Sequence, residues 1–242
     1  MSDAVREVLE GDGVDVRLGT VATDAALAGG RWRVALRRGR DVATVTASHV
    51  LAAVGRVPNT DDLGLEAAGI AVDTRGFIPV NERLETAVAG VYALGDVTGG
   101  PAFTHISYDD YRILRTNLIE GGAATTAGRL VPFVVYTDPQ YGRVGLTETQ
   151  ARTQGRSFRV VSMPVAWITR ALETDESRGV MKALVDESTD RILGAAVLGP
   201  EGGELMSMLQ IAMMGGVTAS TLREAMFAHP TFAESLNNLF AR

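Results

Sequence analysis

The amino-acid sequence predicts two unlike parts: an α/β part up to about residue 130, then an α+β part with an antiparallel sheet. In the first part, two apolar runs typical of strands each end in glycine, at Gly55 and at Gly95-Asp96. From Val131 the pattern changes to short strands, a hairpin and three closing helices. Residues 121–129 are small and polar, which makes them the best candidate for a linker between the two parts.

Composition excludes several classes of function. Hydrophobic residues make up 46% of the chain and charged residues 21%, which is ordinary for a soluble globular protein. The net charge is −6, and the basic cluster Arg31–Arg40 is typical of a solvated hairpin tip, so nucleic acid is not an expected partner. The chain has no cysteine, which excludes disulfides, thiolate metal sites and thiol redox chemistry carried by this sequence alone.

The sequence shows no membrane or export signal. No apolar run is long enough to span a bilayer. The residues from Met1 to Glu10 are acidic and lack the apolar region of a signal peptide. We therefore expect a cytoplasmic location and no membrane partner.

The first part is predicted to consist mainly of strands with short connections. Alternating apolar residues predict a hairpin of residues 32–36 and 42–46 around the turn Arg38-Gly39-Arg40. The continuous apolar run His49–Val54 predicts a buried strand. Shorter patterns predict a strand at Val14–Leu18, a helix at Leu63–Ala68, short strands between residues 70 and 94 that end in Val91–Leu94, and a helix at Ile106–Glu120.

The second part is predicted to be an α+β domain. Its expected strands are Val131–Tyr136, Arg159–Pro164 and a hairpin of Gly179–Val185 with Arg191–Leu198. Thr147–Gly155 is predicted as a helix because Thr147 and Gln150 fit a capping box. The three closing helices are predicted at Glu204–Met214, Thr218–Met226 and Pro230–Phe240. Methionines on these helices favour core packing or a subunit interface over a cofactor site.

The motif His229-Pro230-Thr231-x-x-Glu234 has two interpretations. A histidine with a carboxylate five positions later can form an oriented general acid/base. Alternatively, Pro230 begins a helix and Thr231 with Glu234 forms a capping box, which leaves His229 as a residue at the helix entrance. The local sequence favours the capping box. The other histidines, His49 and His105, have no ligand-like spacing to His229, so no metal site is expected.

Two glycine-containing strand exits are candidate ligand sites. Gly95-Asp96 follows an apolar strand, where α/β folds place ligands and a carboxylate can accept bonds from sugar hydroxyls. A helix that begins near His105 would offer its N-terminal amides to an anion or a polarised carbonyl. Gly55-Arg56 projects a fixed positive charge from the other exit. Each motif taken alone also fits an ordinary turn.

In their order along the chain, these motifs resemble the flavin-dependent pyridine nucleotide-disulfide oxidoreductases, the family of dihydrolipoamide dehydrogenase, glutathione reductase and mercuric reductase. The resemblance covers nearly the whole chain. The motifs that carry it are Gly55-Arg56-x-Pro58-Asn59, Asp73-x-Arg75-Gly76, Tyr92-Ala93-Leu94-Gly95-Asp96-Val97, Thr137-x-Pro139, Val144-Gly145-Leu146-Thr147-Glu148 and His229-Pro230-Thr231-x-x-Glu234. Within the family, Phe103–Ile113 is most similar to the bacterial reactive-chlorine-resistance flavoproteins, which are mercuric-reductase-like. The C-terminal cysteine pair expected of a mercuric reductase is missing, so mercury reduction is not expected.

The resemblance implies cofactor-binding roles. Gly95 and Asp96 would bind the ribityl and pyrophosphate region of FAD, and Gly55-Arg56 would belong to the same set of cofactor-binding residues. The helix that starts near Thr104 and His105 would direct its N-terminus at the flavin C2 carbonyl and stabilise negative charge on the reduced ring.

The resemblance also implies a homodimer. The segment from about Val131 would be the dimerisation domain. His229, oriented by Glu234, would reach across the two-fold interface as the acid/base for the thiol/disulfide pair of the partner subunit. On this basis the active site is a composite of two subunits.

The sequence departs from the family pattern in three places. It lacks the Gly-x-Gly-x-x-Gly fingerprint for FAD, the Cys-x4-Cys redox pair and the second glycine fingerprint for NAD(P)H. We therefore expect residues 1–54 to be a remnant of the NAD(P)-binding domain, 55–130 the C-terminal segment of the FAD-binding domain, and 131–242 the dimerisation domain. The implied fold is a partial FAD/NAD(P)-binding Rossmann-like segment followed by an α+β dimerisation domain.

Two hypotheses for function follow. In the first, the chain is the C-terminal part of an enzyme that passes hydride from NAD(P)H to FAD and then electrons to a cysteine pair. The isolated chain is expected to bind neither cofactor tightly and to be inactive, because the helix N-termini that hold the pyrophosphates are missing. In the second, the chain is a stand-alone dimerisation module: a degenerate or truncated paralogue, or a subunit that pairs with a separate N-terminal polypeptide.

Overall fold

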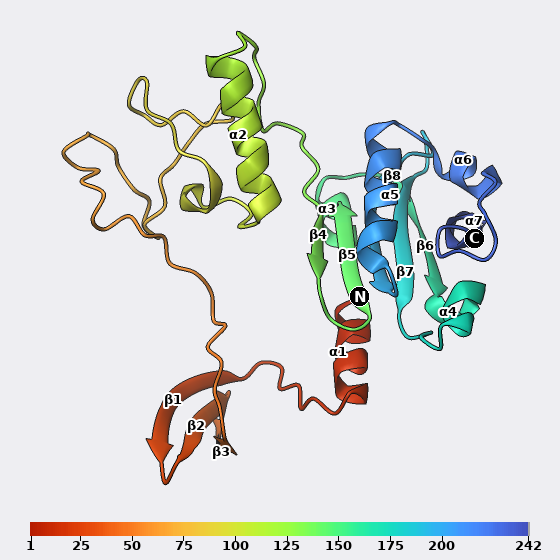
Figure 1. The fold of residues 1–242 in the computed structure, drawn as a ribbon, viewed down its shortest axis with the longest axis horizontal. Helices are drawn as coiled ribbons and strands as arrows, with labels where there is room; N and C mark the ends of the chain where they lie inside the picture. The colour runs from red at the N-terminus through yellow and green to blue at the C-terminus, as the bar shows by residue number, and fades with distance from the viewer. Residues whose placement is uncertain (242) are drawn as a thin grey trace. The chain divides into compact units, whose positions relative to one another are not determined.

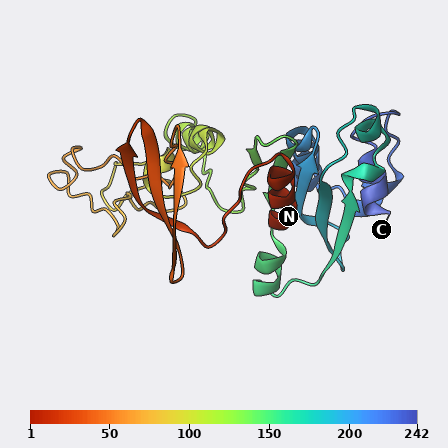
Figure 2. The same cartoon turned by 90° about the horizontal axis from the view of Figure 1, so that it is seen from below.

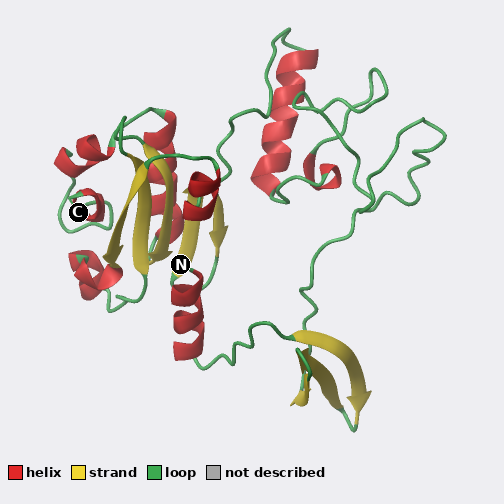
Figure 3. Ribbon diagram, turned by 180° about the vertical axis from the view of Figure 1, so that it is seen from behind, coloured by secondary structure: helices red, strands yellow, loops and turns green. Residues whose placement is uncertain are grey.

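The computed structural model describes residues 1–241. The chain divides into two compact units: Leu9–Val57 forms the smaller one, and Met1–Val8 with Pro58–Arg242 forms the larger one. Figure 3 shows the strands gathered into two sheets, one in each unit. Within the described residues, no helix is long and apolar enough to cross a bilayer.

The smaller unit is built on a three-stranded antiparallel sheet in the order β1-β2-β3. Its strands are β1 (Val21–Ala28), β2 (Arg31–Arg38) and β3 (Asp41–Ala47), which Figure 2 shows side by side. The β2–β3 turn needs Gly39, whose φ of 59° is left-handed. The predicted hairpin of residues 32–36 and 42–46 is therefore confirmed. Strand β1 escapes prediction because its alanine-rich sequence has little β-propensity.

The N-terminal residues differ from the predicted strands. Helix α1 spans Ser2–Gly11, and the predicted strand Val14–Leu18 is irregular. The predicted strand His49–Val54 is also wrong, and the Leu51 and Val54 residues in it are 90% and 93% exposed. Such a run is buried only when other strands pair with it, and within residues 1–241 none does.

The first residues of the larger unit after Pro58 consist mostly of turns. The predicted helix Leu63–Ala68 is wrong, because Gly64 takes a left-handed φ of 66° that interrupts helical geometry. The strands predicted between residues 70 and 94 are also wrong, and a single bridge joins Glu85 to Tyr92. Without a longer partner strand among the described residues, these extended segments have no hydrogen-bond ladder to join.

One long helix, α2 (Thr104–Leu118), confirms the helix predicted at residues 106–120. A single 3₁₀ turn, η1 (Gly95–Thr98), precedes it. The buried residues of α2 are Ile106, Asp110 and Ile113, spaced at four and three residues and therefore on one face. This face carries a carboxylate between two isoleucines.

The second half of the larger unit is an α+β domain with a five-stranded antiparallel sheet in the order β4-β5-β8-β7-β6. The strands are β4 (Phe133–Val135), β5 (Gln140–Gly145), β6 (Phe158–Pro164), β7 (Val180–Asp186) and β8 (Ile192–Gly199). Four of them match predicted strands, including the β7–β8 hairpin. Strand β5 escapes prediction because its two glycines weaken the strand pattern.

Helix α5 (Gly202–Met214) packs on β5 and β8 (Figure 1) and matches the helix predicted at residues 204–214. The helix backbone comes so close to β5 that a Cβ on Gly142 would lie 2.4 Å from the Gly202 carbonyl oxygen. Leu205 and Leu209 on this helix meet Met163 of the sheet in one core cluster, and each is at most 1% exposed. Burial of this cluster is the main stabilising term of the domain.

Four short helices complete the domain. Helix α3 (Glu148–Thr153) has the predicted capping box, with Gln150 N bonded to the Thr147 hydroxyl. Helix α4 (Thr169–Glu173) was not predicted. Helix α6 (Ala219–Glu224) lies within the predicted Thr218–Met226. Helix α7 (Ser235–Phe240) begins five residues later than the predicted helix start at Pro230.

Candidate active site

His229 and Glu234 form a hydrogen-bonded pair in the segment between α6 and α7. The Nδ1 atom of His229 lies 2.9 Å from Oε2 and 3.2 Å from Oε1 of Glu234. The histidine side chain is 66% exposed and the glutamate side chain 19% exposed. Because an ionised carboxylate only accepts hydrogen bonds, Nδ1 carries the proton of the neutral ring. The lone pair is then on Nε2, which has no hydrogen-bond partner within residues 1–241.

This geometry replaces the predicted capping box at Thr231 and Glu234. The Thr231 hydroxyl accepts a bond of 3.3 Å from Glu234 N, as a capping box requires. The Glu234 carboxylate, however, does not return to the backbone and instead contacts the imidazole. The two side chains therefore have different partners: Thr231 bonds to the backbone in the turn before α7, and Glu234 orients His229.

Asn237 fixes the other side of this segment. Its Nδ2 atom lies 2.8 Å from the Ala225 carbonyl, 2.9 Å from that of Leu222 and 3.0 Å from that of Arg223. These carbonyls belong to the last turn of α6 and to Ala225, its C-cap, where carbonyl groups lack intrahelical donors or have few of them. Asn237 thereby ties α7 to α6 at the start of the chain segment that carries His229.

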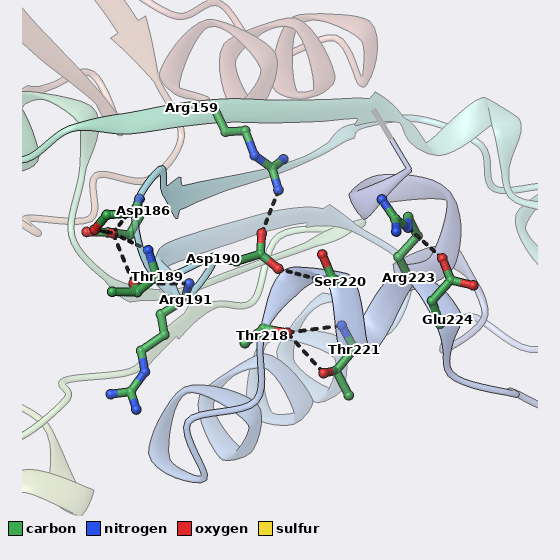
Figure 4. Close-up of polar contacts among 11 residues, drawn as sticks. Arg159, Asp186, Thr189, Asp190, Arg191, Thr218, Ser220, Thr221, Arg223 and Glu224 are labelled. Carbon is green, nitrogen blue, oxygen red and sulfur yellow. Dashed lines mark hydrogen bonds and ion pairs between the residues drawn. The ribbon is translucent and has the colours of Figure 1, made fainter.

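Asp190 fixes the N-terminus of α6 (Figure 4). Its carboxylate accepts from Ser220 N at 2.7 Å and from the Arg159 guanidinium at 2.9 Å, and its carbonyl accepts from Ala219 N at 2.9 Å. Burial raises the pKa of Asp190, but the bonds from Ser220 and Arg159 outweigh it and hold the pKa below its ordinary value. The β7–β8 hairpin therefore holds both α6 and, through α6, the histidine segment.

Gly95 packs directly against α2. It has a left-handed φ of 74°, and a Cβ there would lie 2.7 Å from the Ser107 hydroxyl oxygen. A side chain at this position would be strained at this φ and would require the Ser107 hydroxyl to move. Its N–H donates a 2.9 Å bond to Asp110, and its carbonyl accepts a 2.9 Å bond from the Thr98 hydroxyl. The structure thus brings the predicted Gly95-Asp96 motif to α2, with Asp96 exposed at the turn.

Asp110 is the buried centre of this arrangement, at 1% exposure. Besides the Gly95 amide, it accepts a 2.6 Å bond from Arg129 Nη1, and the Arg129 side chain is 21% exposed. The carboxylate therefore joins η1, α2 and the segment before β4. Asp110 was not singled out as a site residue from the sequence, yet its position on the same helical face as Ile106 and Ile113 was the available signal.

Thr104 and His105 lie exposed in the first turn of α2. The His105 ring stacks on Phe103 with centroids 5.1 Å apart, and its Nε2 donates a 2.8 Å bond to the Pro132 carbonyl. The His105 side chain is therefore engaged, whereas the first backbone amides of α2 have no intrahelical partner. They border a 420 Å³ pocket that Tyr136 also lines.

The predicted site residues do not form one cluster. Gly55, with a φ of 124°, and Arg56 are exposed and belong to the smaller unit. Gly95, Asp96 and the start of α2 belong to the larger unit. Within that unit α2 and α7 lie well apart (Figure 1), and the His229–Glu234 pair belongs to the segment between α6 and α7.

Two family descriptions match the chain. "Pyridine nucleotide-disulphide oxidoreductase, dimerisation domain" matches residues 131–240, and "Pyridine nucleotide-disulphide oxidoreductase" matches residues 1–110. The chain belongs to the pyridine nucleotide-disulphide oxidoreductase family. The predicted fold class, a Rossmann-like segment followed by an α+β dimerisation domain, is confirmed as that of the family. The domain boundaries at residues 54 and 130 stay a prediction.

Individual relatives agree with this assignment. The probable pyridine nucleotide-disulfide oxidoreductase RclA of Escherichia coli is 46% identical over 82% of this chain and 45% of its own length. The dihydrolipoyl dehydrogenase of Thermus scotoductus is 38% identical over 96% of this chain and 50% of its own length. The solved structure of the HOCl-induced flavoprotein disulfide reductase RclA from Escherichia coli has a TM-score of 0.91 at 40% identity, covering 99% of this chain and 55% of that chain. The chain thus spans about half the length of these relatives.

Proposed function

We propose that this chain supplies the C-terminal, dimer-forming part of an FAD-dependent NAD(P)H:disulfide-type oxidoreductase, with His229 and Glu234 as its acid–base pair. The observation that carries the proposal is the 2.9 Å contact between His229 Nδ1 and the Glu234 carboxylate. Family membership and relatives named as disulfide reductases and dihydrolipoyl dehydrogenases support it.

The pair suits thiol/disulfide exchange. The thiolate attacks a disulfide, so a base must take the proton of an incoming thiol and return it to the leaving sulfur. Glu234 leaves the Nε2 lone pair of His229 exposed and stabilises the imidazolium that forms when Nε2 takes a proton. The histidine can therefore act in both directions without moving its own ring.

A homodimer explains why the pair and α2 lie apart within the larger unit. The match of residues 131–240 to a dimerisation domain supports contact between two copies through this region. We infer that His229 of one subunit faces the site that the partner subunit builds. A two-subunit active site of this kind needs no contact between α7 and α2 of the same chain.

The residues around Gly95 fit part of an FAD site. The missing Cβ at Gly95 allows the chain to pass close to α2, Asp96 is exposed at the turn, and the α2 amides point from a helix N-terminus. Asp96 would hold ribityl hydroxyls, and the Thr104 and His105 amides would polarise the flavin C2 carbonyl. Bound FAD would supply hydride acceptance from NAD(P)H and electron transfer to a cysteine pair.

A chimera tests the proposal. Residues 1–242 are joined in frame to the N-terminal half of the Escherichia coli relative, and NAD(P)H-dependent disulfide reduction is measured. We expect a yellow, active dimer whose activity falls by about 10²–10⁴-fold in His229→Asn, the range for loss of a general acid–base group. The flavin spectrum and dimer mass of this variant stay unchanged. Full activity in His229→Asn would contradict the assigned role.

A second candidate function is a non-catalytic dimerisation module. The observation that favours it is the self-contained core of the C-terminal domain, which includes fully buried residues from α5, α7 and the sheet. It is tested on the 242-residue chain alone by light scattering and absorbance. The module is favoured over the enzyme if two results occur together: the chain alone forms a colourless, stable dimer, and the chimera is inactive.

A further inference from the structure

A large cavity in the larger unit lies outside the proposed acid–base pair. Its volume is ≈ 960 Å³, within the size range of small-molecule sites. Its walls come from α2, from the segment that leads to β4, from β8 and from the last turn of α5. The lining includes neither His229 nor Glu234, and neither Gly95 nor Asp96.

The cavity also lies on a different side of α2 from Gly95. The residues of α2 that line it include His105, Asp109 and Arg112, which are spaced at four and three residues and share one face. Gly95 packs on Ser107, two positions from His105 and therefore about 200° around the helix. The His105, Asp109 and Arg112 side of α2 that lines the cavity therefore differs from the Ser107 side that Gly95 contacts.

The walls of the cavity concentrate positive charge. Four arginines line it, and Asp109 is the one acidic side chain among its described lining residues. The whole chain has a net charge of −6, with 29 acidic and 23 basic residues, so this grouping runs against the overall balance. A concave surface with one sign of charge focuses its field and attracts the opposite ion. The arginines are Arg112, Arg129, Arg156 and Arg191.

Two of these arginines are already paired and two are not. Arg112 bonds to Asp109 at 2.8 Å, and Arg129 bonds to Asp110 at 2.6 Å. Neither the Arg156 nor the Arg191 guanidinium has an acidic or hydrogen-bonding partner within residues 1–241.

The position of the Arg191 side chain in the fold directs its guanidinium toward the cavity. Figure 4 shows its guanidinium extending away from the carboxylates of Asp186 and Asp190, which both precede it in the β7–β8 hairpin. A Cβ on Gly216 would lie 3.5 Å from its Nη2, which places the group beside the turn that ends α5. The negative end of the helix dipole favours a cation at this position. Arg191 is therefore held at the cavity wall with its bonding capacity unused.

We propose that this cavity is a binding site for a phosphorylated small molecule with an apolar body. The guanidinium fork matches phosphate oxygens, and one phosphate monoester carries a charge of about −1.5 to −2, which balances two unpaired arginines. Leu193, Met213 and Met214 form an apolar wall in the same cavity. Arg156 and Arg191 bind the phosphate, and this wall contacts the rest of the molecule.

Calorimetry on the 242-residue chain, with inorganic pyrophosphate and ADP as probes, tests the anion site. Arg156→Gln and Arg191→Gln should each weaken pyrophosphate binding by about tenfold, because a hydrogen bond to a charged group contributes enough for one such factor. Arg152→Gln is the matched control: it removes the same charge from a side chain that is 70% exposed and outside the cavity lining. It should change the Kd by less than about twofold. ADP should bind more tightly than pyrophosphate if the apolar wall takes part.

Methyl spectra locate the bound probe. The chain has eight methionines, and pyrophosphate should shift the methyl signals of Met213 and Met214 but not that of the fully buried Met163. Circular dichroism confirms that each variant is folded before it is titrated. Absence of binding at low salt, or equal weakening in Arg152→Gln and Arg191→Gln, would overturn the proposal. Shifts confined to methionines outside the cavity would overturn it as well.

Discussion

Replacement of Asp110 by alanine should be the most damaging single change around α2. The carboxylate is 1% exposed and accepts two bonds, one from Gly95 N at 2.9 Å and one from Arg129 Nη1 at 2.6 Å. Alanine removes both acceptors, so the buried Gly95 N–H loses its partner and the Arg129 guanidinium retains the longer 3.4 Å contact to Asp109. The change acts at the junction of η1, α2 and the segment before β4.

The expected cost has two contributions. A buried N–H without a partner costs about 1–3 kcal/mol. Loss of one member of an ion pair costs about 3–5 kcal/mol when the pair is buried and about 0–1 kcal/mol when it is exposed. Arg129 is 21% exposed, so water replaces part of its lost bond and its contribution falls between these limits. We expect Asp110→Ala to destabilise the larger unit by about 3 kcal/mol.

Urea denaturation and hydrogen exchange of the Gly95 amide measure this effect together. Asp109→Ala is the matched control, because Asp109 is adjacent, also contacts Arg129 and Arg112, and has a side chain that is 30% exposed. It should cost less than about 1 kcal/mol. Equal destabilisation by the two substitutions, or unchanged protection of the Gly95 amide in Asp110→Ala, would refute the reasoning.

Three further predictions concern packing, the glycine turn and pH. Leu209→Ala, at a fully buried position of α5, should lower the free energy of unfolding by about 2–5 kcal/mol in urea denaturation, and a smaller loss would show that the core collapses around the gap. Gly95→Ala should perturb the Ser107 signals in a heteronuclear spectrum and abolish flavin binding in the chimera, because the new Cβ would lie 2.7 Å from the Ser107 hydroxyl and φ is 74°. Bonds from the Ser188 and Thr189 groups lower the pKa of Asp186 from 3.8 to about 2. Its stabilisation is therefore present above pH 3.8 and lost as the pH falls through about 2, so Asp186→Asn should flatten the thermal stability profile between these values.

The C-terminal domain was largely predictable from the sequence because its elements carry local signals. The β7–β8 hairpin, α3 with its capping box and α5 each depend on alternation, a cap or an apolar helix face within the segment itself. The strand predicted at His49–Val54 was wrong for the opposite reason. Its apolar pattern describes a strand only where neighbouring strands exist, and no described strand lies beside it. The hydrophobic pattern of a segment shows which residues it could bury, and the neighbouring elements determine whether those residues are buried.

The turn at Gly95 shows the same difference between local pattern and tertiary packing for a candidate site residue. Gly95 was recognised by its dipeptide and its place after an apolar run, and the structure adds that a Cβ there would lie 2.7 Å from the Ser107 hydroxyl oxygen. Its main partner Asp110 lies fifteen residues away, on a helical face that otherwise reads as core. A contact between residues this far apart cannot be inferred from the local sequence around Gly95. A charged residue on an apolar helical stripe does indicate one, because a buried carboxylate needs partners.

The His229 motif shows why sequence alone favoured the less interesting interpretation. A capping box and an acid–base pair demand the same residue types at nearly the same spacing, and one carboxylate cannot serve both partners fully. What separates them is where α7 begins. With the helix starting at Ser235, Glu234 lies at its N-cap position with its carboxylate directed at the imidazole, while Thr231 supplies the bond that the backbone needs. Asn237 of α7 bonds to the carbonyls of Leu222 and Arg223 in α6 and of Ala225 after it, so contacts between the two helices hold the segment that carries the histidine.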